Sequence, residues 1–423
     1  MACDDRLTVC NLLLKIQKNS GYSNLALDGE LRKNQAKNPS FVSKVFYGVI
    51  ERKITLDYQI SLYLDKPIEK IDSKIKCILR MGVYQLLYMD NIPDRAAIDE
   101  SVKLSKKLNM PYASGFINAV LRKVASNGEV LPDGDNSTQY LSVKYSCPIW
   151  LVKSFLNSYG YKSTCDILKS SLGKKTVFIR INNVKTNKSE LCNIFDEEGV
   201  KYSEIQDFPN SLVIEYSGDI RRLSSFERGC FYVEDLSSQI CADRLGAQSS
   251  DRILDVCAAP GGKTFTLAQN LSDGEIISCD IHPHRVKLIE QGAERLGLSA
   301  VKPTVNDALK VKESFGEFDK ILCDVPCSGF GVLGRKPEIK YKSFDEVADL
   351  PEIQLSILQN SFYYLKRGGT IIYSTCTLLE RENSKVVKKF LKNNTDAVLV
   401  EQRVILPSEY GSDGFYYCVL KKE

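Results

Sequence analysis

Apolar residues in roughly the first 125 positions recur at spacings of three and four, which places them on one face of a helix. The clearest stretches are Leu7–Ile16, Phe41–Ile50, Ile75–Leu87, Ile98–Leu108 and Phe116–Leu121. Proline, which ends or interrupts helices, separates the later stretches at Pro93 and Pro111. The pattern predicts an all-α bundle that buries these faces in one core.

The pattern changes after residue 126. Residues 127–139 (NGEVLPDGDNSTQ) are rich in Gly, Asp, Asn and Pro, and this composition indicates a linker. Residues 140–230 combine helical stretches with alternating segments typical of strands at Thr176–Asn182 and Ser211–Tyr216. We therefore expect a small α/β subdomain over residues 140–230.

From residue 231 onward, short apolar segments alternate with helical stretches, an order that implies a parallel sheet with helices on its faces. The strand candidates are Ile253–Cys257, Glu275–Asp280, Val301–Val305, Lys320–Asp324, Thr370–Ser374 and Phe415–Leu420. The helix candidates are Thr264–Asn270, His284–Leu296, Leu350–Leu365 and Arg381–Lys392. Residues 231–423 are expected to form a doubly wound, Rossmann-like α/β domain with an antiparallel edge.

The composition excludes some classes of protein. No run of about 18 apolar residues occurs and the first residues lack a signal-peptide pattern, so we expect a cytoplasmic protein with no membrane segment. The 14 cysteines include no CxxC pair and there are only 2 histidines, which argues against a metal site. Residues 1–138 carry 20 Lys/Arg against 16 Asp/Glu, whereas residues 231–423 carry 24 against 27. A basic first part suits nucleic-acid phosphates, although ordinary surface charge explains these counts nearly as well.

The segment Cys257–Lys263 (CAAPGGK) follows an apolar strand candidate and precedes a helix candidate. Glycine in such a turn lets bare backbone approach a ligand, and the N–H groups of the following helix favour polar or anionic groups. Ligands of open α/β sheets bind in the crevice at the carboxyl ends of the strands. The turn alone is a weak signal, because many α/β domains contain one without a ligand.

Acidic residues at the ends of three later strand candidates, Asp280, Asp307 and Asp324, strengthen the case for a nucleoside ligand. A carboxylate after the second strand can accept both ribose hydroxyls, and one after the third can accept from an adenine amino group. Each alone is also explained as a helix cap or turn, and Asp307 is the weakest of the three. The turn lacks the first glycine of a phosphate-binding P-loop, which leaves a nucleotide hydrolase as the second choice. S-adenosylmethionine, a nucleoside without phosphate, suits the looser turn.

Two cysteines, Cys327 and Cys376, each follow a strand candidate of the predicted sheet. A thiolate that adds to C6 of cytosine makes C5 nucleophilic enough to attack a methyl sulfonium, and a second cysteine can assist release of the product. Each cysteine alone is as well explained as a small residue in a tight turn. The pair beside a nucleoside site favours covalent catalysis.

The motifs resemble those of known families. Tyr22–Leu27, Leu79–Leu87, Ile92-Pro93 and Phe116–Arg122 are similar to the NusB-type RNA-binding helical domain. CAAPGGKT (Cys257–Thr264), DVPCSGFGVLGRKPEIKY (Asp324–Tyr341), YSTCTLLERENSKVV (Tyr373–Val387) and DGFYYCVL (Asp413–Leu420) resemble the signatures of RNA cytosine-5 methyltransferases. Together they resemble the bacterial 16S ribosomal-RNA cytosine-5 methyltransferases of the RsmB/Sun type.

This resemblance implies a multidomain protein with a NusB-like RNA-binding domain at 1–126, a linker at 127–139, a small subdomain at 140–230 and a catalytic domain at 231–423. The implied reaction is methylation, from S-adenosylmethionine, of C5 of the cytosine at position 967 of 16S rRNA through a Cys–C6 adduct. We expect rRNA as partner, no membrane, and a monomer.

The resemblance also implies roles for individual residues. The methyl donor would be bound by Cys257, Ala258, Ala259, Pro260, Gly261, Gly262, Lys263, Asp280, Asp307 and Asp324. Cys376 would be the nucleophile and Cys327 would assist release, but DNA cytosine methyltransferases use the Pro-Cys cysteine as nucleophile, and the sequence alone leaves both assignments open.

Basic residues Arg335, Lys336 and Lys340 can hold RNA phosphates or form an ordinary solvated loop. Glu234 stands where the family usually has Gln, and Gly334 where a basic residue is common; both departures can tune RNA affinity. Because the two cysteines are retained, a non-catalytic ribosome-assembly factor is the less favoured alternative.

Overall fold

The computed structural model describes residues 4–19, Leu27, Gly29 and residues 36–423. The chain forms two compact units, one of residues 1–172 with 333–342 and the other of residues 173–332 with 343–423. Of the NusB-like motif at Tyr22–Leu27, residues Tyr22–Ala26 lie outside the described residues.

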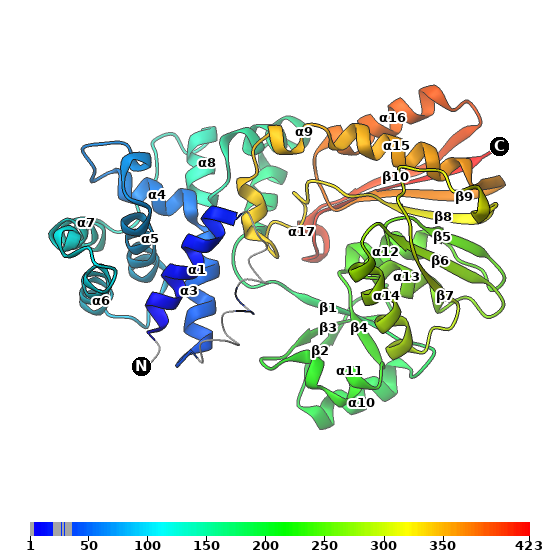
Figure 1. Ribbon diagram of the computed structural model, residues 1–423, viewed down its shortest axis with the longest axis horizontal. Helices are drawn as coiled ribbons and strands as arrows, with labels where there is room; N and C mark the ends of the chain where they lie inside the picture. Colours follow the sequence, from blue (N-terminus) through cyan, green and yellow to red (C-terminus); the bar gives the residue numbers. More distant parts are fainter. Residues whose placement is uncertain (1–3, 20–26, 28, 30–35) are drawn as a thin grey trace. The chain divides into compact units, whose positions relative to one another are not determined.

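The first unit is helical, which confirms the predicted all-α bundle (Figure 1). Its α-helices are α1 (Asp5–Asn19), α3 (Pro39–Glu51), α4 (Lys53–Ser61), α5 (Ser73–Tyr88), α6 (Asp94–Lys107), α7 (Ser114–Asn127), α8 (Thr138–Tyr145) and α9 (Ile149–Ser170). Side chains of Asn38 and Asp72 accept hydrogen bonds from the first turns of α3 and α5, which satisfies backbone N–H groups there. The predicted apolar faces pack into one core that includes Phe46, Ile78 and Leu121.

The segment 333–342, which follows the Pro-Cys motif in sequence, belongs to this helical unit. It contains the 3₁₀ helix η5 (Pro337–Tyr341), and the Tyr341 hydroxyl donates to Ile50 O at 2.7 Å. Lys340 is fully buried and its Nζ donates to Glu51 O at 3.3 Å. A buried ammonium that is hydrogen-bonded to the chain lies neither on an RNA phosphate nor in a solvated loop, so both alternatives that the sequence left open are wrong for Lys340.

The second unit contains a small four-stranded antiparallel sheet with strand order β2-β3-β1-β4. The strands are β1 (Val177–Ile181), β2 (Lys201–Glu204), β3 (Ser211–Glu215) and β4 (Phe231–Val233). The helices α10 (Lys188–Glu198) and α11 (Ser224–Glu227) accompany it, and Phe195 of α10 packs edge-on against Phe231. Strand β4 pairs with β1, although the sequence assigned residue 231 to the catalytic domain, because a three-residue strand carries too little periodicity to show its partner.

The second sheet has seven strands in the order β10-β11-β9-β8-β5-β6-β7. The strands are β5 (Arg252–Asp255), β6 (Glu275–Asp280), β7 (Val301–Val305), β8 (Phe318–Asp324), β9 (Leu365–Thr375), β10 (Ala397–Ile405) and β11 (Phe415–Lys422). Strands β5 to β9 pair in parallel, whereas β11 lies antiparallel between β9 and β10. The sequence predicted the antiparallel edge but missed β10, which is itself the edge strand.

Helices cover both faces of this sheet (Figure 1). The helices α12 (Leu236–Leu245), α13 (Gly262–Ala268) and α14 (Pro283–Leu296) pack on one face, and α15 (Leu350–Tyr363) and α16 (Ser384–Asn393) on the other. Among the described residues, α17 (Pro407–Tyr410) is the last helix, and no helix is long and apolar enough to cross a membrane. The carboxyl ends of β5, β6, β8 and β9 lie along one edge, which gathers the residues that follow them.

Candidate active site

The turn Cys257–Lys263 joins β5 to α13 at this edge. The backbone N–H of Ala258 donates to Cys279 O at 2.7 Å, which fixes the turn against β6. Gly261 has a φ of +112°, and a Cβ at this position would collide with the Phe265 ring. Both the backbone conformation and the lack of space therefore require glycine at position 261.

A cavity with a volume of about 220 Å³ lies against this turn. The predicted residues in its lining are Cys257, Ala258, Ala259, Pro260, Gly262, Lys263 and Asp324, and the others are Val233, Glu234, Asp235, Ser238 and Asp255. The structure thus brings most of the turn together with the end of β8, as the sequence predicted.

Two of the lining carboxyls, Glu234 and Asp255, are buried, and sequence reasoning gave neither a role in the cavity. Thr264 Oγ1 donates to Asp255 Oδ2 at 2.6 Å, and Thr266 Oγ1 donates to Glu234 Oε2 at 2.7 Å. Their other oxygens, Asp255 Oδ1 and Glu234 Oε1, have no hydrogen-bond partner in the described chain. Burial raises the pKa of each carboxyl to about 7. Buried acceptors without partners fit a ligand that brings donors or positive charge into the cavity.

The one lysine of the cavity wall forms an ion pair. Lys263 Nζ donates to Asp324 Oδ2 at 2.7 Å, and Ser374 Oγ donates to Asp324 Oδ1 at 2.7 Å. Burial by itself would lower the pKa of Lys263, but the nearby Asp324 carboxylate outweighs it and raises that pKa above the ordinary value. The ammonium therefore stays charged, and it is compensated by a carboxylate held from both sides.

Asp280 lies at the end of β6, where the sequence placed it, but outside the cavity lining described above. Its Oδ1 accepts from the backbone N–H of His282 at 3.0 Å and its Oδ2 pairs with Arg285 Nη1 at 3.0 Å. Arg285 Nη2 also donates to Ala259 O at 2.8 Å. Arg285, in the first turn of α14, thus links Asp280 to the turn Cys257–Lys263. No signal in the sequence indicated this contact, because the two segments meet only in the tertiary structure.

Asp307 follows β7 and does not line the cavity either. Its Oδ1 accepts from the backbone N–H of Leu309 at 3.0 Å, and Lys310 Nζ lies 3.4 Å from Oδ2. These contacts are those of a side chain that closes a local turn, the alternative that the sequence left open for this residue.

The two cysteines lie together. Cys327 follows β8, Cys376 follows β9, and their Sγ atoms are 3.2 Å apart. The pKa of Cys327 is raised well above the ordinary thiol value, first by the hydrogen bond to Cys376, then by burial and by the carboxylates of Glu382 and Asp324. Within this contact the thiol form of Cys327 is therefore favoured over its thiolate.

Side chains of a short segment after Cys376, Glu382 and Asn383, hold the two cysteine loops. Glu382 Oε2 accepts from the backbone N–H of Ser328 at 2.9 Å, beside Cys327. Asn383 Oδ1 accepts from Thr375 Oγ1 at 2.6 Å and its Nδ2 donates to Thr377 O at 2.9 Å, so it ties together the residues on either side of Cys376. Both are buried polar residues of the motif Tyr373–Val387, but their hydrogen-bond partners become apparent only in the fold.

Glycines from two other motifs complete the frame of the site. The backbone N–H of Gly331 donates to Cys376 O at 2.9 Å, and that of Gly414 donates to Gly331 O at 2.9 Å. A Cβ on Gly331 would collide with the backbone of Gly414. The cysteine loops and the start of β11 are thus packed backbone to backbone.

The fold and this site define the class of the protein: a methyltransferase with a Rossmann-like catalytic domain, a small antiparallel domain and a helical domain. The chain belongs to the RsmB/F family of 16S rRNA methyltransferases, which act from S-adenosylmethionine on small-subunit rRNA. Residues 242–421 match the family described as "16S rRNA methyltransferase RsmB/F", residues 4–126 match the NusB family, and residues 147–221 match the ferredoxin-like domain of RsmF/B-like methyltransferases.

Relatives match nearly the whole chain, over nearly their own whole length. The "Probable ribosomal RNA small subunit methyltransferase B" of Bacillus subtilis is 36% identical over 97% of both chains, and the "Ribosomal RNA small subunit methyltransferase B" of Proteus mirabilis is 31% identical over 95% of both. Among solved structures, PH0851 matches with a TM-score of 0.82 at 24% identity and covers 100% of both chains, which shows the shared fold. NSun6 from Pyrococcus horikoshii with SFG matches 65% of this chain and 98% of its own, with a TM-score of 0.61 at 23% identity.

Proposed function

We propose that this protein methylates C5 of one cytosine of 16S rRNA, by family resemblance the cytosine at position 967, through a covalent adduct on Cys376. The observation that carries the proposal is the 3.2 Å separation of the Cys327 and Cys376 Sγ atoms, near the cavity that Asp324 and most of the turn Cys257–Lys263 line. Because the substrate is rRNA, we also propose that the protein works in the cytoplasm, and that it works as a monomer.

The cavity residues fit S-adenosylmethionine, which supplies a methyl group on a positively charged sulfur. The proposed donor-binding residues are Cys257–Lys263, Asp280, Asp307 and Asp324. The geometry supports the turn and Asp324 most directly, since they form the cavity wall. Asp280 supports the turn through Arg285, and both of its carboxylate oxygens are engaged, by the His282 N–H and by Arg285. Asp307 has the least support, because its carboxylate already closes a local turn.

The cysteine pair suggests how the work is divided. Cys376 adds as thiolate to C6 of the cytosine, forming the S–C6 bond and moving electron density to C5, which then takes the methyl group. Cys327 keeps its proton while it is hydrogen-bonded to Cys376 before the reaction with cytosine, and this hydrogen bond is the largest cause of its raised pKa. Once Cys376 is bonded to C6, that contact ends and Cys327 becomes more acidic. Cys327 then gives its own proton to solvent, and its thiolate takes the C5 proton. The electron pair of the C5–H bond re-forms the C5–C6 double bond, the S–C6 bond breaks and Cys376 leaves as thiolate.

The opposite assignment, with Cys327 as nucleophile, is less well supported. A nucleophilic cysteine needs an accessible thiolate, and burial, Cys376 and two carboxylates all hold the proton on Cys327. Asn383 braces the loop on both sides of Cys376, which suits the residue that must meet C6 with fixed geometry.

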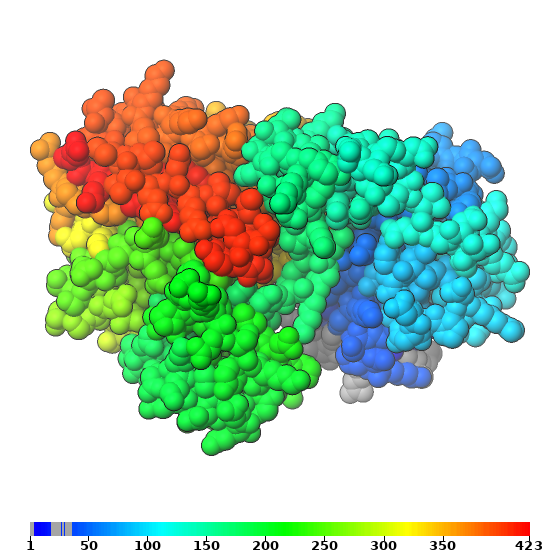
Figure 2. All heavy atoms as spheres, turned by 180° about the vertical axis from the view of Figure 1, so that it is seen from behind, coloured from blue at the N-terminus to red at the C-terminus, as the bar shows by residue number. Residues whose placement is uncertain are grey.

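A row of lysines next to this site suits the phosphates of the RNA chain. Helix α16 buries Val386, Val387 and Phe390 and exposes Lys385, Lys388, Lys389 and Lys392 on its other face. Within the described part of the chain none of the four lysines forms an ion pair, and α16 contains no acidic residue. The helix begins directly after Asn383, and it forms part of the surface seen in Figure 2 (orange-red). We propose that this lysine face holds phosphates that flank the target cytosine.

Methyl transfer to unmodified 16S rRNA tests the reaction, with Cys323→Ala, a buried cysteine of β8, as the matched control. We expect the wild type and Cys323→Ala to label one cytosine at C5, Cys376→Ala to be inactive, and Cys327→Ala to accumulate a covalent RNA complex. A covalent complex that forms with Cys376→Ala would reverse the two roles. RNA binding without methyl transfer by the wild type, on free rRNA or immature subunits, would instead favour the assembly-factor alternative.

The salt dependence of RNA binding tests the lysine face. Each phosphate contact contributes roughly 0.7–0.9 to the slope of log affinity against log salt concentration. Replacing the four lysines of α16 by glutamine should lower the magnitude of that slope by about 3, whereas glutamine at the exposed Lys287 and Lys302 should leave it nearly unchanged. An unchanged slope in the α16 variant would remove this surface from the proposal.

A further inference from the structure

Glu234 has an unusual electrostatic position in the wall of the donor cavity. It follows β4 directly, only 7% of its surface is exposed, and its Oε1 has no hydrogen-bond partner among the described residues. A Cβ placed on Gly262 would lie 2.9 Å from Oε1, so the glycine at the start of α13 leaves just enough space for this carboxyl. A buried acceptor without a partner is unfavourable, and its place in the wall of a ligand cavity explains why it is kept.

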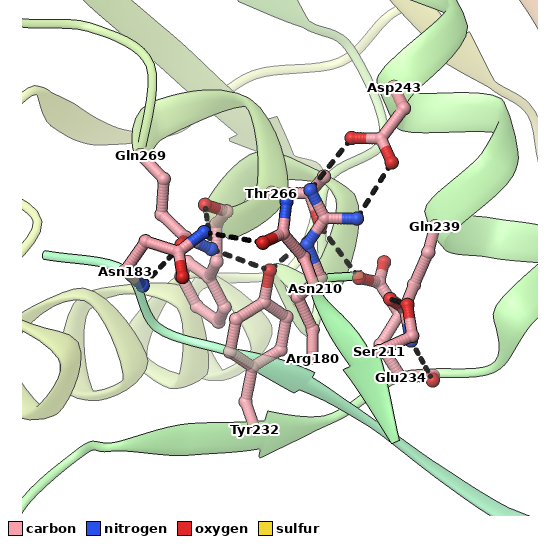
Figure 3. Close-up of polar contacts among 11 residues, drawn as sticks. Arg180, Asn183, Asn210, Ser211, Tyr232, Glu234, Gln239, Asp243, Thr266 and Gln269 are labelled. Carbon is pink, nitrogen blue, oxygen red and sulfur yellow. Dashed lines mark hydrogen bonds and ion pairs between the residues drawn. The ribbon is translucent and has the colours of Figure 1, made fainter. Parts of the chain in front are cut away.

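The other oxygen of Glu234 ends a chain of hydrogen bonds that runs in one direction (Figure 3). Gln269 Nε2 donates to the Tyr232 hydroxyl at 3.1 Å, and an amide nitrogen can only donate. Tyr232 can therefore donate to Thr266 Oγ1, 2.7 Å away, and Thr266 donates in turn to Glu234 Oε2 at 2.7 Å. Thr266, the last donor of this chain, occupies Oε2, so Oε1 remains as the buried oxygen without a partner in the cavity wall.

The positive charges near Glu234 already have carboxylate partners of their own. Arg180 on β1 donates twice to Asp243 on α12, at 2.7 and 2.8 Å, and Lys263 on α13 is paired with Asp324. No ion pair of the described chain includes Glu234. The remaining titratable groups that act on it, Tyr232 on β4 and Cys241 on α12, are neutral at physiological pH, since burial raises the pKa of both. An ionised Glu234 is therefore a local negative charge without a dedicated counter-ion.

This negative charge affects the binding of two nucleosides, the methyl donor S-adenosylmethionine and its product S-adenosylhomocysteine. The methyl donor carries a positive sulfur, an ammonium and a carboxylate, for a net charge of +1, whereas the product has lost the charge on sulfur. We propose that Glu234, ionised when the donor is bound, is a specificity-determining residue that makes the cavity prefer the positively charged donor over its neutral product. This inference rests on the proposed donor site. Glu234 would then act on the methyl donor in its cavity, and not on RNA affinity as the sequence suggested.

Proton linkage gives the expected measurements. Burial raises the pKa of Glu234 to about 7, so below this pH the carboxyl is mostly protonated before the donor binds, and binding the cationic donor must release that proton. One released proton makes affinity rise by about tenfold per pH unit below about pH 7, with a plateau above it. Asp255 also has an oxygen without a partner and a raised pKa, so it can release a second proton. The test is therefore how much the slope of log affinity against pH decreases in the Glu234 variant.

The experiment measures dissociation constants of S-adenosylmethionine and S-adenosylhomocysteine from about pH 5.5 to 8.5 for the wild type, Glu234→Gln and the control Glu290→Gln, an exposed carboxylate of α14. Glutamine keeps an oxygen for Thr266 but removes the charge. We expect Glu234→Gln to lose about one unit of slope for the donor, and to lose on the order of tenfold in its preference for donor over product near pH 8. Glu290→Gln should behave as the wild type.

Calorimetry of the wild type in buffers of different ionisation enthalpy gives a second measurement that needs no variant. It should show more protons released on binding the donor than on binding the product. Equal proton release for both ligands, or an unchanged preference in Glu234→Gln, would overturn the inference while leaving the donor site intact. Failure of the wild type to bind either ligand at any pH would overturn the proposed donor site as well.

Discussion

The brace formed by Asn383 can be tested by replacing it with alanine. Asn383 is 2% exposed and makes two side-chain hydrogen bonds, one from Thr375 Oγ1 at 2.6 Å and one to Thr377 O at 2.9 Å. Alanine removes both and leaves the Thr377 carbonyl without this donor. The residues on either side of Cys376 are then free to move relative to the cytosine.

The expected magnitude follows from these two contacts. A neutral hydrogen bond contributes about 0.5–1.5 kcal/mol net, and a buried group left without its partner costs about 1–3 kcal/mol. Asn383→Ala should therefore lower the free energy of unfolding by about 2–4 kcal/mol. A misplacement of about 1 Å at a reacting atom costs about a hundredfold in rate, so we expect kcat to fall by about that factor.

The assay compares kcat for methyl transfer, the dissociation constant of S-adenosylmethionine and the melting temperature. Asn394→Ala is the matched control, because Asn394 makes a single side-chain bond, to Phe390 O at 2.9 Å, at the far end of α16. We expect Asn383→Ala to lose kcat while it keeps donor affinity, and Asn394→Ala to keep both. A folded Asn383→Ala protein with kcat within about threefold of the wild type would refute the reasoning.

Three further changes have expected outcomes. Gly261→Ala places a Cβ against the Phe265 ring at a φ of +112°, so it should destabilise the protein by more than about 1 kcal/mol and abolish donor binding, as measured by denaturation and titration. Burial raises the pKa of Glu234 from 4.5 to about 7, so without ligand its contribution to stability is complete below about pH 4.5 and is lost as pH rises through about 7. Glu234→Gln should therefore remove about 3 kcal/mol of the change in unfolding free energy with pH, as measured by denaturation between about pH 5 and 8. Lys340→Ala should lower stability by about 2–4 kcal/mol and leave the salt slope of RNA binding unchanged, because Lys340 is buried; a reduced slope would restore it as an RNA contact.

The sequence by itself determined which local structures form. Periodic apolar faces predicted the helices of the first unit, and the alternation of strands and helices predicted most of the seven-stranded sheet, because side-chain periodicity reports directly which face of an element is buried. The turn Cys257–Lys263 and the two cysteines were identified because their chemistry depends on residue type and on position after a strand. Family membership follows from the same motifs.

Only the tertiary structure decided which elements are neighbours. Periodicity does not identify the partner of a buried face, so the insertion of β11 between β9 and β10, and the pairing of β4 with β1, could not be predicted. For the same reason Lys340 was expected on the surface and is buried. Glu234 and Cys257 are 23 positions apart in sequence and line one cavity, while Asn383 braces Cys376 from a neighbouring loop. The groups that tune charge and position in this site come from different elements, and packing alone brings them together.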